Sequence, residues 1–126
     1  MIAGIGVDLA TVSRVSRVHK KFGDRFARRI LNPVEWDTYS HHHNPARFLA
    51  KRFAVKEAAV KALGTGERHG VLLKDFYLQH DDLGKPILKV SGKASVRCER
   101  QGITHFWVSI TDEGDTVAAF VVLEQG

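Results

Sequence analysis

Three ionisable side chains of the sequence could together handle phosphate chemistry, namely Asp8, Glu57 and Lys61. Asp8 ends an apolar segment, and a carboxylate at the end of a rigid strand is a common magnesium ligand. Glu57 and Lys61 are one helical turn apart, in the order that favours an ion pair. If the N-terminal strand packs along the Glu57 side of the helix, two carboxylates and an ammonium group would suit a hydrated Mg²⁺ bound to phosphates.

Each of these residues also has a purely structural interpretation. A lone Asp8 is more often a turn-forming or helix-capping residue. Glu57 and Lys61 could be an exposed ion pair, which is worth only about 0.3–0.5 kcal/mol. No spacing rule demonstrates contact between residues 8 and 57, so the magnesium hypothesis depends on the fold.

A helix over residues 45–63 is the most regular element that the sequence predicts. Asn44-Pro45 provides an N-cap and a first-position proline, and Gly64 should end the helix in a left-handed conformation. One broad face is apolar, as a core-facing helix requires. This face carries Phe48, Leu49, Phe53, Val55, Ala59, Val60, Ala62 and Leu63. Glu57 and Lys61 lie opposite. Small residues flank them and leave the backbone open to close approach: Ala50, Ala54 and Ala58.

Two basic residues fall near the middle of this apolar face. Arg52 and Lys56 are one turn apart, and a charge in such a place costs several kcal/mol unless it is paired or reaches water. A ligand or a subunit boundary would explain them. Long stems that cover apolar neighbours and expose their tips would explain them equally well.

The remaining elements indicate an α+β protein, with helices mainly in the first half of the chain and strands in the second. Residues 2–9 are typical of a strand whose glycines allow another backbone or a ligand to approach closely. The expected helices are 11–23, 24–31, a segment opened by the capping box Asn32-Pro33-Val34-Glu35, and 91–102. The expected further strands are 72–80, 87–90, 106–111 and 117–123. Pro86 excludes a central-strand position, and the apolar run 117–123 should be buried.

Composition limits the class of protein. The 126 residues, 44% hydrophobic and 26% charged, are enough for one folded domain over 1–126 and exclude whole-chain disorder. The single cysteine, Cys98, excludes a disulfide scaffold or thiolate metal cluster and fits a reducing compartment. We find no apolar run of ~20 residues and no signal-peptide pattern. We therefore expect a cytoplasmic protein without membrane association.

The net charge of +5 and the pI near 9.6 favour an acidic partner. A nucleic-acid-binding module is one alternative, because Phe22 and Phe26 accompany the basic segment 25–29, but the chain has no recognition motif and we expect no nucleic acid partner. An assembly subunit without catalysis is another alternative. Histidines 41–43 are expected in a solvated loop and Cys98 as a small buried residue.

Two motifs together closely resemble those of the bacterial holo-acyl-carrier-protein synthases, which are 4'-phosphopantetheinyl transferases. The first is Gly4-Ile5-Gly6-Val7-Asp8 with Arg14 downstream, and the second is FLAKRFAVKEAAVKA at 48–62. The likeness continues through Gly64-Thr65-Gly66, Leu83-Gly84-Lys85-Pro86 and the closing hairpin. It therefore covers essentially the whole chain in order.

The resemblance implies transfer of 4'-phosphopantetheine from coenzyme A to a serine hydroxyl of apo acyl carrier protein, with release of adenosine 3',5'-bisphosphate. It implies the fold of these transferases, in which a small antiparallel sheet packs with a long central helix, and a homotrimer with active sites at subunit boundaries. Asp8 and Glu57 match the family's Mg²⁺ ligands, and Lys61 matches the lysine beside the coenzyme A pyrophosphate. These three are the expected catalytic residues. Glu57, directly or through a metal-bound water, is the first choice of general base, and a residue of the carrier protein is the alternative.

The resemblance also suggests which residues bind coenzyme A and the carrier protein. The expected coenzyme A ligands are Lys61, Gly64, Arg52 and Lys56. Arg14 matches an arginine of the first helix that meets acidic residues of the carrier protein. A basic docking surface would comprise Arg14, Arg17, Arg25, Arg28 and Arg29, although any of them could simply be solvated. Some relatives carry a histidine where this chain has Asp112, so Asp112 receives no role.

Overall fold

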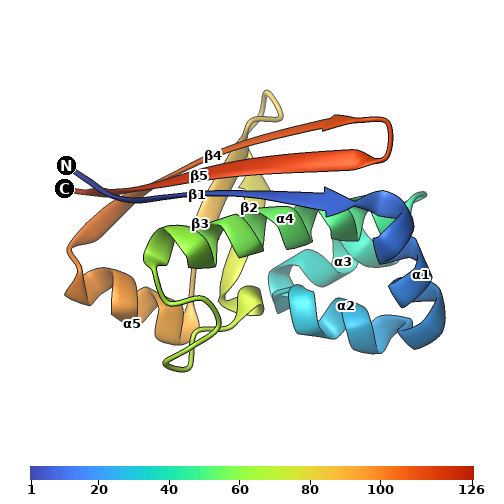
Figure 1. Ribbon diagram of the computed structural model, residues 1–126, viewed down its shortest axis with the longest axis horizontal. Helices are drawn as coiled ribbons and strands as arrows, with labels where there is room; N and C mark the ends of the chain where they lie inside the picture. The colour runs from blue at the N-terminus through green and yellow to red at the C-terminus, as the bar shows by residue number, and fades with distance from the viewer.

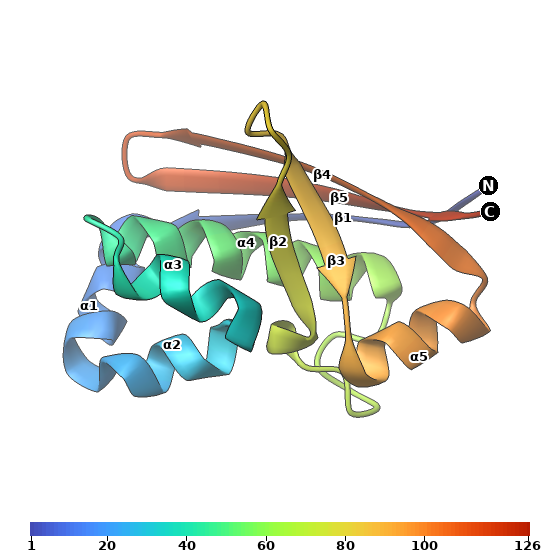
Figure 2. The ribbon, with the colours of Figure 1, turned by 180° about the vertical axis from the view of Figure 1, so that it is seen from behind.

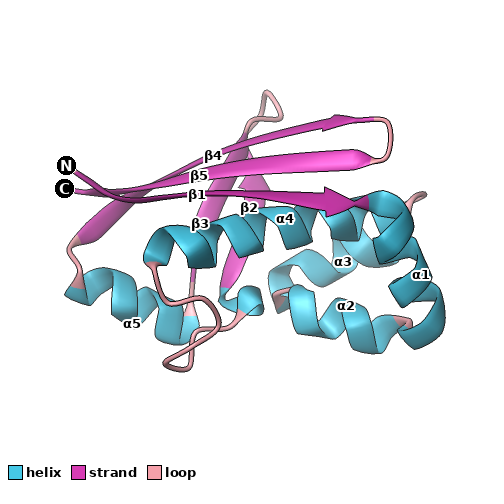
Figure 3. Ribbon diagram, in the orientation of Figure 1, coloured by secondary structure: helices cyan, strands magenta, loops and turns pink.

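Three long antiparallel strands form a sheet that carries helices on one side only (Figures 1 and 3). The computed structural model describes all 126 residues. The sheet has the order β1-β5-β4, and its strands are β1 (Ile2–Thr11), β4 (Ile103–Glu113) and β5 (Thr116–Gln125). A separate antiparallel hairpin consists of β2 (Phe76–His80) and β3 (Pro86–Val90). Figure 2 shows this hairpin crossing in front of the long helix α4 (Pro45–Leu63).

The helices gather into two groups around α4. At one end lie α1 (Val12–Phe22), α2 (Asp24–Ile30), the 3₁₀ turn η1 (Pro33–Glu35) and α3 (Trp36–Ser40). The second group consists of the 3₁₀ turn η2 (Leu73–Asp75) and α5 (Gly92–Arg100). None of them has both the length and the apolar content needed to cross a bilayer. The α+β class and the order of helices and strands are confirmed.

The ends of α4 are those that the sequence predicts. The side chain of Asn44 accepts a hydrogen bond from the backbone N–H of Arg47 at 3.2 Å, Pro45 occupies the first turn, and Gly64 ends the helix with φ 84°. Its surroundings differ from the prediction, because α4 is buried on nearly all sides. The alanines at 50, 54 and 58 are completely buried. The face of α4 that carries these small side chains, which we call the small face, therefore packs against the rest of the protein.

Strand β1 lies directly on this small face because two of its residues have no side chain. A Cβ added to Gly4 would collide with the carbonyl oxygen of Ala62, and one added to Gly6 would collide with that of Ala58. Residue numbers therefore increase along β1 in the direction in which they decrease along α4, so the strand and the helix run antiparallel. Side chains alternate along a strand, so Asp8 shares the α4-facing side of β1 with both glycines. The predicted close approach to these glycines is confirmed, and the approaching group is a helix backbone.

The sequence predicts which segments are helices and strands more accurately than it predicts the residue at which each one begins. Thr11 is at the N-cap of α1 but makes no side-chain cap bond, and Asp115 caps the helix instead through the backbone N–H of Ser13 at 3.0 Å. The predicted strand at 72 begins only at Phe76, because the Asp75 side chain accepts the N–H of Leu72 and closes a 3₁₀ turn. Asp24 is the first residue of α2 rather than its cap.

The outward face of the long sheet is apolar and exposed. On β5 the residues at 117, 119, 121 and 123 are buried, whereas Phe120 between them is 44% exposed. The prediction that 117–123 is buried as a whole is therefore wrong, since burial alternates. The same face of β1 presents Ile5, Val7 and Leu9, which are 59%, 57% and 65% exposed.

Candidate active site

Asp8 and Lys61 form an ion pair between β1 and α4. Nζ of Lys61 lies 2.7 Å from Oδ1 of Asp8 and 3.3 Å from the carbonyl oxygen of Val7. The two residues are distant in the sequence and meet because Gly4 and Gly6 allow β1 to rest on α4. Lys61 is about half exposed while Asp8 is mostly covered, so the pair lies at the edge of the strand–helix contact. This confirms that the N-terminal strand packs along the Glu57 side of the helix.

Glu57 shares the electrostatic environment of this pair. Burial raises the pKa of Glu57, and the nearby carboxylates of Glu67 and Asp8 raise it further, whereas Lys61 acts in the opposite direction. The hydrogen bond to Asp8 raises the pKa of Lys61. The carboxylates of Asp8 and Glu57 and the ammonium group of Lys61 are thus close enough to influence one another, and Glu67 adds a third negative charge.

The donor set fits Mg²⁺ that a phosphate substrate helps to bind. Mg²⁺ prefers oxygen ligands, keeps several waters, and is usually held by one or two carboxylates together with substrate phosphates. Asp8 and Glu57 provide two such carboxylates, and their mutual repulsion is what a divalent cation would relieve. No cluster of three or more His, Cys, Asp or Glu side chains in the structure could hold a metal ion by itself. An all-protein metal cage is therefore absent.

Gly64 lies one turn beyond Lys61, at the end of α4. Its backbone N–H donates to the carbonyl oxygens of Val60 and Lys61, both at 3.1 Å. The following loop contains Glu67, whose charge acts on Glu57. Gly64 is thus a left-handed helix stop that turns the chain back beside Glu57 and Lys61.

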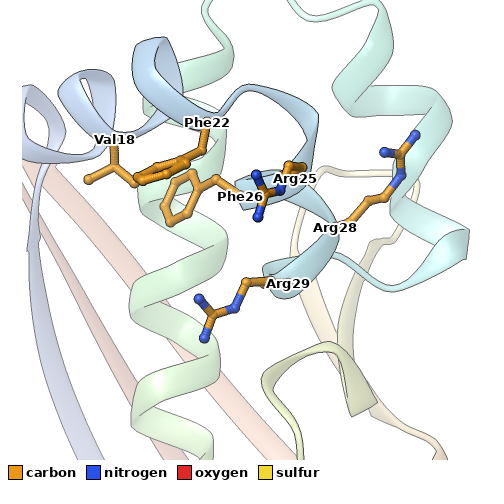
Figure 4. A pocket seen from close by; sticks show the side chains of 6 residues that line it. All are labelled: Val18, Phe22, Arg25, Phe26, Arg28 and Arg29. Atoms are coloured by element: carbon orange, nitrogen blue, oxygen red, sulfur yellow. The ribbon is translucent and has the colours of Figure 1, made fainter.

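The five arginines form an exposed basic surface on α1 and α2, which we call the basic helical surface. Its members are Arg14, Arg17, Arg25, Arg28 and Arg29. All are exposed, and none of them takes part in an ion pair within the chain. Figure 4 shows the last three around a cavity of about 460 Å³ whose apolar wall is Val18, Phe22 and Phe26. Positive charge and apolar surface therefore occur together here.

The chain matches a known protein family. The model of the 4'-phosphopantetheinyl transferase superfamily matches residues 4–121. The chain belongs to this superfamily. Its Asp8, Glu57 and Lys61 all lie within the matched region.

Individual relatives narrow the assignment within the superfamily. The holo-[acyl-carrier-protein] synthase of Nitrosospira multiformis is 49% identical over 99% of this chain and 100% of its own length. The crystal structure of the Neisseria meningitidis synthase has a TM-score of 0.93, with 46% identity over 99% of this chain and 100% of that one. The Bacillus anthracis synthase, solved in complex with CoA (3',5'-ADP), has a TM-score of 0.81. It is 34% identical, and the match covers 100% of this chain and 99% of that one.

These similarities confirm the resemblance seen in the sequence. The fold is that of the holo-acyl-carrier-protein synthases, and the chain is a phosphopantetheinyl transferase.

Arg52 and Lys56 of this transferase meet Glu35 in the interior. Nζ of Lys56 lies 2.5 Å from Oε1 of Glu35 and 2.7 Å from the carbonyl oxygen of Ile30, and Lys56 is 0% exposed. Nη1 of Arg52 lies 3.4 Å from Oε2 of Glu35, with the guanidinium over the Phe48 ring. Burial lowers the pKa of Lys56 to about 8 although Glu35 opposes this shift.

This geometry gives no support to Arg52 and Lys56 as coenzyme A ligands, because Lys56 has no exposed surface in the chain. Neither side chain is more than 8% exposed, so the interpretation that both expose their tips to water is not supported either. Glu35 was not predicted as their partner, because its position in the sequence indicated only a capping box. That capping box is present, and the same carboxylate also accepts the N–H of Leu78 at 3.0 Å. The signal in the sequence was the presence of Arg52 and Lys56 on an apolar face, because two buried positive charges require an acidic partner.

Three other residues are placed by the structure. Asp112 forms an ion pair with Arg47 at 2.6 Å, which ties the β4–β5 hairpin to the start of α4. Cys98 is buried, as expected, and burial raises its thiol pKa to about 11. His42 and His43 stack on each other.

Proposed function

We propose that this transferase moves the 4'-phosphopantetheine group of coenzyme A to a serine hydroxyl of an apo acyl carrier protein and releases adenosine 3',5'-bisphosphate. The observation that carries the proposal is the Asp8–Lys61 ion pair beside Glu57, at the contact of β1 with α4. The relatives support it, because they are holo-acyl-carrier-protein synthases and one of them contains CoA (3',5'-ADP).

The reaction is a phosphoryl transfer, in which positioning and charge stabilisation do most of the work. A bond forms between the serine oxygen and the phosphorus that bears pantetheine, while the bond from that phosphorus to the bridging pyrophosphate oxygen breaks. Asp8 and Glu57 would hold Mg²⁺, which when bound neutralises pyrophosphate charge. Lys61 stabilises the negative charge that develops on the leaving phosphate.

The serine proton needs an acceptor, and Glu57 is the group we propose. Its pKa is raised by burial and by neighbouring carboxylates. A carboxylate within reach of the serine hydroxyl can accept its proton. Glu57 would do so directly or through a water.

The basic helical surface is the proposed docking site for the carrier protein. Its arginines are exposed and have no acidic partners within the chain, so they are free to meet an acidic protein. Complementary charges of this kind raise association rates and weaken with salt. The adjoining apolar cavity in Figure 4 adds surface that a partner could bury.

The exposed apolar face of the sheet supports the proposal of a homotrimer. Ile5, Val7 and Leu9 form a row on β1 beside Phe120 of β5. Monomeric proteins rarely expose contiguous apolar surface of this kind, and such surface marks an interaction site. A trimer would bury it and could complete each active site with a neighbouring subunit. We place the assembly in the cytoplasm, where the single cysteine would remain reduced.

Intact-mass spectrometry of the carrier protein tests the proposed function. The purified enzyme is incubated with Mg²⁺, coenzyme A and an apo carrier protein, with a parallel sample that lacks coenzyme A. The carrier should gain the mass of the phosphopantetheine group only in the complete mixture, with matching release of adenosine 3',5'-bisphosphate. No gain in mass would contradict the proposal. Salt-sensitive binding to random duplex DNA, without any response to coenzyme A, would favour the nucleic-acid alternative.

A further inference from the structure

Tyr39 joins three helices through hydrogen bonds that the proposed chemistry does not use. It lies on α3, and its phenol oxygen is 2.9 Å from Oδ1 of Asp24 on α2 and 2.8 Å from Nε2 of His19 on α1. Tyr39 is only 7% exposed. A phenol has a single proton to donate. Because that proton goes to the Asp24 carboxylate, the phenol oxygen accepts the N–H of His19.

The position of the phenol is fixed by packing on its ring. The ring centroid lies 5.0 Å from that of Trp36 and 6.3 Å from that of Phe48, and the His19 ring meets it edge-on at 5.9 Å. Burial and the hydrogen bond to Asp24 raise the pKa of Tyr39 to about 12, so the phenol keeps its proton at neutral pH. Tyr39 is thus a rigid junction between the two helices that it contacts.

The direct connection between these two helices is a single residue. Gly23 separates α1 from α2, has φ 55°, and has open space where a side chain would be. Glycine permits more backbone conformations than any other residue. The angle between α1 and α2 therefore depends on contacts outside the joint, and the bonds of Tyr39 to His19 and Asp24 bridge it.

This angle sets the spacing of the arginines. Arg14 and Arg17 lie on α1, whereas Arg25 and Arg28 lie on α2. A partner that contacts both helices at once binds more tightly when they are already held in place, because less freedom is lost on binding. We propose that Tyr39 is a positioning residue for carrier-protein binding, which holds α1 and α2 so that both groups of arginines meet one acidic surface. This role presupposes that the enzyme modifies carrier proteins as proposed above.

The test removes one hydroxyl and keeps the aromatic ring. Steady-state kinetics are measured for Tyr39→Phe with apo carrier protein and coenzyme A varied in turn. The matched control is Tyr77→Phe, at the only other tyrosine of the chain, which lies on β2. Tyr39→Phe loses the hydrogen bonds to both Asp24 and His19, and we expect it to raise the KM for the carrier about fivefold, the factor that corresponds to about 1 kcal/mol of weaker binding. The KM for coenzyme A and kcat should stay within about twofold, and Tyr77→Phe should match the wild type.

A second pair of variants keeps the test decisive if Tyr39→Phe folds poorly. His19→Gln retains an N–H donor near the phenol, whereas His19→Ala removes it, so glutamine should preserve the carrier KM better than alanine. The dissociation constant of the carrier, measured by calorimetry without coenzyme A, should follow the same order. A role in stability alone would lower the melting temperature and leave the carrier KM unchanged.

Three results would overturn the role of Tyr39. They are an unchanged carrier KM in Tyr39→Phe, an equal rise in the KM for coenzyme A, and identical behaviour of His19→Gln and His19→Ala. Failure of the proposed function is recognised separately, because the wild-type enzyme would then transfer nothing. Carrier binding by calorimetry still tests the positioning role in that case.

Discussion

At the scale of single residues, Asp8 and Glu57 are expected to be essential for transfer but not for folding. Asp8→Asn and Glu57→Gln each remove the negative charge of a carboxylate that would bind Mg²⁺, and neither reduces the volume of the core. Each should lower kcat/KM by at least about 100-fold. Melting temperatures should stay close to that of the wild type. The control is Glu99→Gln, at an exposed position of α5, which should keep full activity. Full turnover by either site variant at low Mg²⁺ would contradict these roles.

The raised pKa of Cys98 gives a pH prediction at the same scale. Burial raises this pKa from 9.0 to about 11, so at pH 8 the reactive thiolate is scarcer in the folded protein than in an exposed cysteine. We expect labelling by a thiol reagent at pH 8 to be at least about 100-fold slower than for the unfolded chain, since two pKa units correspond to a factor of 100. The rate should rise with pH up to about 11. Rapid labelling of the native protein at pH 8 would show that the thiol is not enclosed.

At the scale of elements, the contact of β1 with α4 controls the position of Asp8. Gly6→Ala would place a Cβ against the carbonyl oxygen of Ala58, so the strand would have to move off the helix. We expect a loss of about 3 kcal/mol or more in the free energy of unfolding, measured by urea denaturation. Gly102→Ala is the comparison, since its φ of 71° is unfavourable but its surroundings are open. That variant should lose only about 1 kcal/mol, and equal losses in both would contradict the role of close packing.

The elements also show which features a sequence can predict. The limits of α4 follow from Asn44, Pro45 and Gly64, which act on their own backbone neighbours, and both limits are confirmed. The cap of α1 could not be predicted in this way. It comes from Asp115, which is far along the chain and reaches the helix only after β5 has paired with β1.

The same distinction applies to the candidate site. Asp8 could be linked to Glu57 and Lys61 only through a packing assumption, and glycines in β1 with alanines in α4 were the signal for that packing. The ion pair of Asp8 with Lys61 confirms it. Glu35 was missed as the partner of Lys56 because capping-box spacing explains an acidic residue at that position without reference to the interior. The exposed side of β5 was missed because its apolar run carries no visible alternation.

At the scale of the whole molecule, the proposed trimer depends on the exposed side of the sheet. Val7→Glu would place a charge within the buried interface but on a residue that is exposed in the single chain. By light scattering, the wild type should have about three times the chain mass of 14.1 kDa, and the variant a smaller mass. Val34→Glu is a matched control, because Val34 is also 57% exposed but lies on η1. A wild-type mass of one chain, or an unchanged mass in Val7→Glu, would contradict this interface.

Asp8 of β1 and Glu57 of α4 are proposed to share one Mg²⁺ with the pyrophosphate of coenzyme A. Calorimetric titration of coenzyme A into the enzyme, with and without Mg²⁺, measures whether the metal ion and the pyrophosphate bind together. We expect Mg²⁺ to tighten coenzyme A binding to the wild type, and we expect this effect to disappear in both Asp8→Asn and Glu57→Gln. The same Mg²⁺ effect in the wild type and in either variant would contradict this proposal.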